Sequence, residues 1–473
     1  MPIKNPFGGR IYFAALALAG LVGCSQDGTP NPGLAFPFAG KYRAAQDATP
    51  VLLNNAGWWQ RFEDPTLDQL VETGLSGGLS LELARERVIE AQASLRAVPG
   101  SAAVSPSVGA KLAGDDTGQS QVSGNGTLGL TWVLDPYGAR REELKAARAR
   151  VDVAGAEADA AQLLLLDKIA TAYIDLRHSQ KLVQLRQQEV ASRRKIVALT
   201  QRFADQGEAT RLETTRAAAL LAEVQSQIPV IEAHIQSQKN QIAILAGRPP
   251  GTLEIDLDAG AKQPRARMSP EVGIPTDLLR NRPDIRIAEQ LYYVAIADGH
   301  IAKTATYPKL SLSGAISVNA IRDAGRSAEY YLGPSVTFPM FDGGSARAKV
   351  DASYSRIRQA HTTWRATVLE AILEVENALL DYRAGGATIT ASEKTVKLYR
   401  ELLSLTRDLA ESDAATLGDL VDAEQSGASA NTALADAVYQ QGLNFVALNI
   451  RLGSGNAYVS APPDPGGKVR AAP

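Results

Sequence analysis

The stretch Lys309–Ala320, with the sequence KLSLSGAISVNA, decides the fold of this chain. Its even positions, from Leu310 to Ala320, are apolar or small, and its odd positions are mostly Ser, Lys or Asn. Because side chains alternate between the two faces of a strand, this stretch predicts a strand with one apolar and one polar face. Two architectures fit this pattern: a half-buried strand of a soluble sheet, and a membrane strand that turns its apolar face to lipid.

Three other stretches alternate in the same way, and they help to decide between the two architectures. We expect strands at about 104–113 and 124–134, which form a hairpin, and at about 309–320 and 330–340. Strands of roughly ten residues are long enough to cross a bilayer when tilted. Four strands are too few to close a membrane barrel, and open edges are not tolerated in lipid. If these strands are embedded in a membrane, several chains must therefore share one barrel.

Very long helical patterns follow each pair of strands. From about 140 to 204 there is no Pro and only one Gly, which predicts a helix of ~97 Å at 1.5 Å per residue. Apolar residues at alternating three- and four-residue steps predict coiled-coil packing. The other expected helices are a return helix at about 208–247, a second long helix at about 345–411 and its return helix at about 416–452. We expect Pro229 to kink the first return helix. In the second long helix the alternation loosens at Gly385-Gly386, and the helix then runs on to about 411.

The two halves of the chain repeat one another. Pro308 follows Pro106 by 202 residues, and Gly453 follows Gly247 by 206 residues. Each half has the order helix, strand, strand, long helix, tip, return helix, which indicates a pseudo-symmetric architecture. The expected organisation is a first repeat at 66–250, a connector at 251–276, a second repeat at 277–455 and a tail at 456–473.

The beginning of the chain has the pattern of an export signal. Residues 1–23 contain two basic residues and an apolar run that ends in a small residue. Leu21-Val22-Gly23-Cys24 resembles a lipobox, which predicts a signal peptide at 1–23 and a lipid-anchored N-terminal segment at 24–65. In the alternative interpretation, the signal is an ordinary one and Cys24, the one cysteine of the chain, is incidental. Elsewhere the sequence has no run of 18 apolar residues, so we expect no transmembrane helix.

Several function classes have little support in the sequence. The net charge of −2 gives no basic field that would attract nucleic acid. Residues 124–129 match GxGxxG, but this motif leads into a strand instead of opening a helix, which argues against a dinucleotide site. The four histidines have no ligand spacing, and no nucleophile with a neighbouring base stands out. We therefore expect neither enzymatic activity nor a metal or other cofactor, apart from a covalent lipid on Cys24.

Four motifs resemble those of a known family. They are WWQRF at 58–62, IPTDLLRNRPDI at 274–285, YPKLSL at 307–312 and FPMFDGG at 338–344. Together they resemble the TolC-like outer-membrane efflux factors, in the lipoprotein branch that contains the OprM and NodT-type proteins. The resemblance covers almost the whole mature chain. It implies an α+β membrane protein that forms a homotrimer, with a 12-stranded β-barrel, four strands per chain, continuous with a long α-helical periplasmic tunnel.

Acidic residues gather where the second long helix turns back. Six acids lie between Asp408 and Glu424, with no basic residue among them. Asp419 and Asp422 share a helix face, and Glu213 is the matching position in the first half. The resemblance implies that these three acids form a periplasmic constriction, with the helix-tip turns at Gly207 and Asp413. The simpler interpretation is that acids near a helix N-terminus stabilise the helix dipole.

From these features we expect an exit channel in the outer membrane of a Gram-negative bacterium, lipid-anchored and extending into the periplasm. The resemblance implies that it conducts small molecules, such as drugs or toxic compounds, from a periplasmic adaptor and an inner-membrane transporter, expected to be of the RND type. One alternative is the outer-membrane component of a type I protein secretion system. Two others are a periplasmic coiled-coil scaffold lipoprotein without a pore and a lipid-anchored enzyme.

Overall fold

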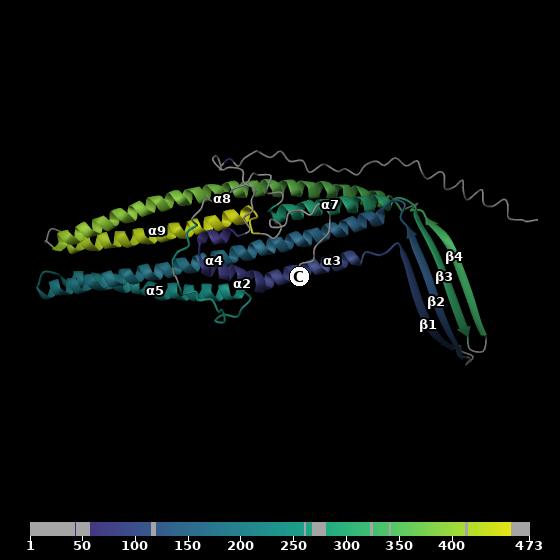
Figure 1. The fold of residues 1–473 in the computed structure, drawn as a ribbon, viewed down its shortest axis with the longest axis horizontal. Helices are drawn as coiled ribbons and strands as arrows, with labels where there is room; N and C mark the ends of the chain where they lie inside the picture. Colours follow the sequence, from purple (N-terminus) through teal and green to yellow (C-terminus); the bar gives the residue numbers. More distant parts are fainter. Residues whose placement is uncertain are drawn as a thin grey trace, which may run out of the picture. The chain divides into compact units, whose positions relative to one another are not determined.

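The computed structural model describes residue 43 and residues 57–114, 120–259, 262–266, 281–321, 325–339, 342–411 and 415–455. Gly100–Glu143 and Ala295–Gln359 form one compact unit around the sheet, and Leu144–Val294 belongs to a second, helical unit. The elements, labelled in Figure 1, are η2 (Trp58–Phe62), α2 (Pro65–Gly77), α3 (Leu79–Arg96), β1 (Ala102–Gly114), β2 (Ser120–Leu134), α4 (Ala139–Asp205), α5 (Arg211–Leu245), α7 (Pro283–Thr304), β3 (Lys309–Ile321), β4 (Gly325–Thr337), α8 (Ser345–Glu411) and α9 (Leu417–Arg451).

The four strands form one antiparallel sheet in the order β1-β2-β3-β4, and its register sorts side chains by polarity. One row across the sheet is Pro106, Leu128, Ile316 and Tyr330. The next row, on the other face, is Ser107, Thr127, Ser317 and Glu329. Within this polar row the hydroxyl oxygens of Thr127 and Ser317 lie 3.1 Å apart, within hydrogen-bonding distance. The alternation seen in the sequence therefore continues across all four strands as two distinct faces.

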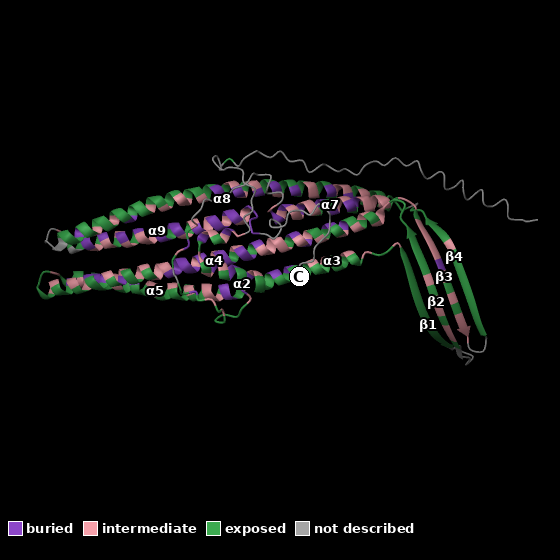
Figure 2. Ribbon diagram, in the orientation of Figure 1, coloured by how far each residue is buried: buried purple, intermediate pink, exposed green. Residues whose placement is uncertain are grey.

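The apolar face of the sheet remains exposed in the single chain. Val108 is 91% exposed, Tyr330 87% and Leu332 67%, although burying such side chains is worth roughly 1.5–3 kcal/mol each. Figure 2 shows the four strands mostly in the colours of exposed and intermediate residues. Among the described helices, none combines the length and hydropathy needed to span a bilayer.

Two strands begin earlier than the sequence pattern predicts. β2 starts at Ser120 instead of about 124, and β4 starts at Gly325 and ends at Thr337 instead of spanning about 330–340. The pairing continues to the ends of both hairpins, where Gly114 faces Ser120 and Ile321 faces Gly325. The side chains there are small or polar, so apolar alternation is lost, but the backbone ladder does not depend on it.

The helices form two long hairpins, α4 with α5 and α8 with α9 (Figure 1). The middle of the apolar seam expected along α8 is buried: Ile357, Trp364, Val368, Ala371, Val375 and Ala378 are each at most 2% exposed. The other seam residues, Val350, Tyr354, His361 and Tyr382, are half-buried. α5 remains one helix through Pro229. As expected, α8 continues through Gly385-Gly386 and ends at Glu411. A side chain at Gly385 would collide with Gln441 of α9, so this glycine allows close helix packing.

The core of the helical unit explains the WWQRF motif. Trp58 and Phe62 are buried, and both pack against the ring of Phe445 in α9, with centroid distances of 6.2 and 5.2 Å. Beside them the hydroxyl of Tyr173 in α4 donates to Asp64, the N-cap of α2, over 2.6 Å. η2 and the start of α2 are thereby fixed against α4 of the first hairpin and α9 of the second.

Arg177 of α4 attaches the connector to this core. The residue is 1% exposed, and its guanidinium donates to the Tyr173 hydroxyl and to the backbone oxygens of Leu257 and Ala259. These bonds satisfy most donors of a buried cation, which would otherwise be costly to remove from water.

The repeat is visible at the ends of the two return helices. Gly247 after α5 and Gly453 after α9 have positive φ angles of 72° and 73°. A Cβ at Gly247 would collide with the backbone oxygen of Gly77, and a Cβ at Gly453 with that of Asn281. Glycine is required at both places because it combines left-handed backbone with a close approach of another segment.

We expect Gly247→Ala and Gly453→Ala each to lower the thermal midpoint of the detergent-solubilised protein. The left-handed backbone alone costs about 1–3 kcal/mol for a non-glycine residue, and the collision adds to this cost. Far-UV circular dichroism during heating measures the effect. Gly207→Ala is the matched control, because Gly207 has a φ of 80° and open space around an added Cβ. An equal loss in all three variants would contradict the role of close approach.

Candidate functional site

The tip of the first hairpin is a tight, capped turn. After α4 the backbone reverses through Gly207, and the N–H groups of Glu208 and Ala209 both donate to the carbonyl oxygen of Phe203, over 2.8 and 3.2 Å. Glu208 and Gly207 are exposed, and no atom lies within 4 Å of a Cβ built on Gly207. Glycine is therefore needed here for its backbone conformation alone.

Glu213 forms a capping box at the start of α5. Its backbone N–H donates to the Thr210 hydroxyl, and its carboxylate accepts from the Thr210 N–H over 2.6 Å. The hydrogen bond from the Thr210 backbone, followed by that from its hydroxyl, lowers the pKa of Glu213. The interpretation that this acid stabilises its own helix is thus supported by geometry.

Asp419 has the same role at the start of α9. Thr416 is the N-cap, and the Asp419 carboxylate accepts from its N–H over 2.9 Å and from its hydroxyl over 2.6 Å. These bonds, with the hydroxyl as the larger contribution, lower the pKa of Asp419. Both acids are held in place and remain exposed, so capping does not prevent them from facing a channel. Asp413 and Cys24 lie outside the described residues.

Asp422 lies one turn beyond Asp419 and faces the other hairpin. It lines a cavity of about 140 Å³ together with Glu213 and Arg216 of α5, while Ile196 of α4 contributes apolar surface. The structure thereby brings Glu213 and Asp422 to one place. It also places a basic residue there, Arg216, which the sequence pattern did not indicate.

Glu424 is not a free member of the acidic cluster. Its side chain is 9% exposed, and it forms an ion pair with Arg407 of α8 over 2.8 Å. The Ser192 hydroxyl of α4 also donates to it, over 2.6 Å. Glu424 therefore links three helices, and Arg407, one residue before the acidic stretch, compensates its charge.

A histidine cluster that sequence spacing did not predict lies where the connector meets α4 and α9. His178 is 8% exposed, and its Nε2 lies 3.2 Å from the Asp436 carboxylate. Its Nδ1 lies 3.2 Å from the amide nitrogen of Gln263, which also donates to the carbonyl oxygen of Ala435. This second bond orients the amide, so Nδ1 accepts and Nε2 carries the proton. The ring stacks on Tyr439, with centroids 4.4 Å apart.

The surroundings of His178 favour the neutral ring. Burial is the largest effect and lowers the pKa of His178, while Asp436 and Asp175 raise it and His234 of α5 lowers it further. A proton on Nδ1 would also oppose the amide N–H of Gln263. Histidines on α4 and α5 come together because His234 reaches Asp175 over 3.0 Å, a contact between helices that no short motif encodes.

Within the described residues, no group of His, Cys, Asp or Glu side chains is arranged to hold a metal ion.

The comparisons with known proteins agree with this architecture. The family model described as "Outer membrane efflux protein" matches residues 70–248 and 274–454, one match for each half. Nodulation protein T of Rhizobium leguminosarum bv. trifolii is 32% identical over 459 residues, covering 94% of this chain and 96% of that protein. The pyoverdine export outer membrane protein OpmQ of Pseudomonas aeruginosa is 30% identical over 380 residues, covering 74% and 77%.

Solved structures show the same fold. The outer-membrane channel OprN matches with a TM-score of 0.82 at 27% identity, covering 91% of this chain and 99% of that chain. The outer membrane protein VceC of Vibrio cholerae matches with a TM-score of 0.75 at 26% identity, covering 85% and 99%. The expected fold class, four β-strands per chain combined with long paired helices, is confirmed.

We expect the stability of the protein to fall as the pH is lowered from about 7.5 to about 5. Because the folded-state pKa of His178 is below its unfolded value near 6.5, the unfolded chain binds the proton more readily. The stabilisation is complete above the unfolded pKa and is lost as pH falls through the folded one. Thermal midpoints in detergent across this range measure the slope, which His178→Gln should reduce. An unchanged slope in His178→Gln would exclude this residue as the source.

Proposed function

Since the chain belongs to the outer membrane efflux protein family, and is therefore an outer-membrane efflux channel and not an enzyme, we propose that it forms the exit duct of a tripartite export system. In this proposal a periplasmic adaptor joins the channel to an inner-membrane transporter of the RND type. The observation that carries the proposal is the face-sorted sheet, whose exposed apolar residues suit lipid and whose polar rows suit a water-filled lumen.

The proposed assembly is a homotrimer. β1 and β4 are the edges of the sheet in one chain, and each has 13 residues with backbone groups that need partners. At about 3.3 Å per residue, 13 residues extend ~43 Å, and a 45° tilt reduces this to roughly the 30 Å of the hydrocarbon layer. Three copies joined edge to edge would give twelve strands and no free edge, which supports closure into one barrel.

The proposed anchor is a lipid on Cys24, in a mature chain that begins there after removal of residues 1–23. The lipobox supports this assignment. A lipid on the N-terminus would add membrane affinity to that of the barrel, at about 0.8 kcal/mol per buried CH₂ group.

We propose that Asp419 and Asp422 form the periplasmic constriction of the trimer, with Glu213 at the matching position of the first hairpin. The fixed, exposed carboxylates at the helix starts support this role. Around one axis, carboxylates from three chains would attract cations and repel one another where unpaired. Opening would rearrange the tips at Gly207 and Asp413. In each chain Arg216 would reduce the repulsion at Glu213 and Asp422, whose cavity it shares.

Small molecules are the favoured cargo. The relatives include proteins named for pyoverdine export, fusaric acid resistance and toluene efflux, all of which concern small organic compounds. A protein-secreting system would use the same type of duct, and it is distinguished by the transporter with which this chain associates.

In planar bilayers we expect Asp419→Asn with Asp422→Asn to lower the cation-to-anion permeability ratio toward one. The Asn side chain at 419 can still accept from Thr416, so the charge is removed while the cap is kept. Thr416→Ala is the reciprocal control, because it weakens the cap and leaves both carboxylates. It should lower thermal stability without a comparable change in ion selectivity. Unchanged selectivity and conductance in the double Asn variant would exclude these acids from the constriction.

Purification of the tagged protein from its native membranes, after growth with labelled palmitate, tests the assembly. We expect a mass of three chains plus detergent, label in the wild type but not in Cys24→Ser, and copurification of an adaptor with an RND-type transporter. A monomeric mass would contradict the shared barrel. Copurification of an ATP-driven protein exporter with its secreted substrate would favour type I secretion instead.

A further inference from the structure

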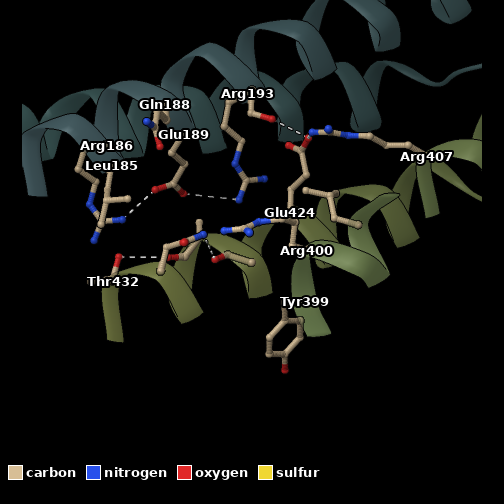
Figure 3. Close-up of a pocket in the computed structure, with 15 residues that line it drawn as sticks. Leu185, Arg186, Gln188, Glu189, Arg193, Tyr399, Arg400, Arg407, Glu424 and Thr432 are labelled. Carbon is tan, nitrogen blue, oxygen red and sulfur yellow. Dashed lines mark hydrogen bonds and ion pairs between the residues drawn. The ribbon is translucent and has the colours of Figure 1, made fainter. Parts of the chain in front are cut away.

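A polar cavity of about 300 Å³ lies where α4 meets both helices of the second hairpin. Figure 3 shows Glu189 and Arg193 extending from α4 toward α9, and Glu424 extending from α9 toward Arg407. Arg193 lies 12 residues before the end of α4 at Asp205, a distance of ~18 Å along the helix axis. The acidic cavity is the next one toward the tips: Ile196 of α4 lines it, one turn beyond Arg193, and the two cavities have no lining residue in common.

The charges that line the cavity do not balance. Four arginines face only two carboxylates, and the six residues are Arg186, Arg193, Arg400, Arg407, Glu189 and Glu424. Glu189 forms ion pairs with two of the arginines. Nη1 of Arg186 lies 2.8 Å from one carboxylate oxygen, and Nη2 of Arg193 lies 3.9 Å from the other. Glu424 pairs with Arg407 over 2.8 Å. Arg400 takes part in no ion pair with the described residues, so the lining keeps an excess of positive charge.

Arg193 is the residue whose environment is least complete. It is 4% exposed, and within the described chain its Nη1 has no hydrogen-bond partner. A guanidinium stays protonated in proteins, so burial cannot neutralise it as it can a lysine or a histidine. A buried cation whose closest carboxylate is shared with another arginine needs a further acceptor.

Two more buried atoms at the same cavity lack partners among the described residues. They are Nε of Arg186, a donor, and Oε2 of Glu424, an acceptor. The residues that line the cavity thus have at least two donors and one acceptor that are unused. A ligand that fits them has several acceptor oxygens and one hydroxyl, and carries negative charge to match the excess of arginine.

A neighbouring cavity is less suited to an anion than the cavity between α4, α8 and α9. That cavity shares Arg186, Glu189 and Arg193, but it also contains Glu223 and Asp436, so its acids outnumber its arginines. An anion would be repelled there. The side bounded by Arg400 and Arg407 is the one that favours negative charge.

We propose that this cavity binds a hydrogen phosphate ion, which carries both acceptor oxygens and a hydroxyl. Two of its oxygens accept from Arg193 and Arg186, and its hydroxyl donates to Glu424. Because these residues come from α4 and α9, the bound anion joins the two hairpins. The association of the hairpins then depends on the concentration of phosphate.

Isothermal titration of the full-length protein in detergent with inorganic phosphate, at about pH 7 and constant ionic strength, tests the proposal. We expect saturable binding by the wild type and affinity weakened about tenfold or more in Arg193→Gln. Arg194→Gln is the matched control, because it removes the same charge from the next position of α4, which is exposed. The proposal is overturned if the wild type shows no saturable binding, or if both variants lose affinity equally.

A second variant protects the test against a folding defect. Arg400→Gln changes an exposed residue at the cavity, so it should fold as the wild type does and still bind phosphate more weakly. Sulfate, which has no hydroxyl at this pH, should bind more weakly than phosphate because it cannot donate to Glu424. Equal affinity for the two anions would contradict the proposed contact with Glu424. A phosphate monoester such as glycerol phosphate, whose phosphate group is mostly a dianion without a hydroxyl at this pH, should also bind more weakly than inorganic phosphate, and tighter binding would contradict the contact with Glu424.

Discussion

The unpaired backbone groups along β1 and β4 impose the constraint on which the rest of the architecture depends. In hydrocarbon no water replaces a missing strand partner, and each unsatisfied N–H or C=O costs several kcal/mol. The sheet has a complete ladder between its neighbouring strands but two edges of 13 residues. A single copy can therefore offer its apolar face to lipid only if other copies occupy those edges. The pseudo-two-fold repeat reduces the number of unpaired edges. Each half supplies one β-hairpin, and the two hairpins pair with each other through β2 and β3.

The acids at the starts of α5 and α9 are both charged and fixed in position, two properties that are difficult to combine at a pore constriction. A carboxylate at a pore constriction must stay charged and fixed in position, although repulsion among copies favours both protonation and displacement. Glu213 and Asp419 are each bound by a threonine N–H and hydroxyl of their own chain, and these bonds lower the pKa of both acids. The capping box thereby keeps the negative charge in place. The capping interpretation and the proposed constriction are thus compatible, and the first supplies a physical basis for the second.

Features with a period along the chain could be predicted from the sequence, whereas features that depend on contacts between distant segments could not. The alternation at Lys309–Ala320 predicted a strand with two faces, and the repeat of three- and four-residue steps predicted the seam of α8. The early start of β4 was missed because its first residues pair through the backbone without apolar alternation. The sequence predicted that the second long helix continues past Gly385, but not that the Gln441 side chain, more than 50 residues away, lies where a side chain at 385 would be. The same limit applies to His178 and Arg193, whose partners come from other helices.

The distribution of packing along the hairpins indicates where they hold together and where they can move. The α4 side chains of the main hydrophobic core lie between Leu165 and Leu176, and they share this core with Phe445 of α9; toward the tip, Val190 and Ile196 are buried outside it. From His178 toward the tips, the contacts that link α4 to the second hairpin include the Asp436 ion pair and the Glu424 hydrogen bond. Apolar burial resists separation in proportion to the area involved, whereas partly exposed polar contacts exchange readily with water. A rearrangement of the tips would therefore separate polar contacts first and leave the core as its fixed point.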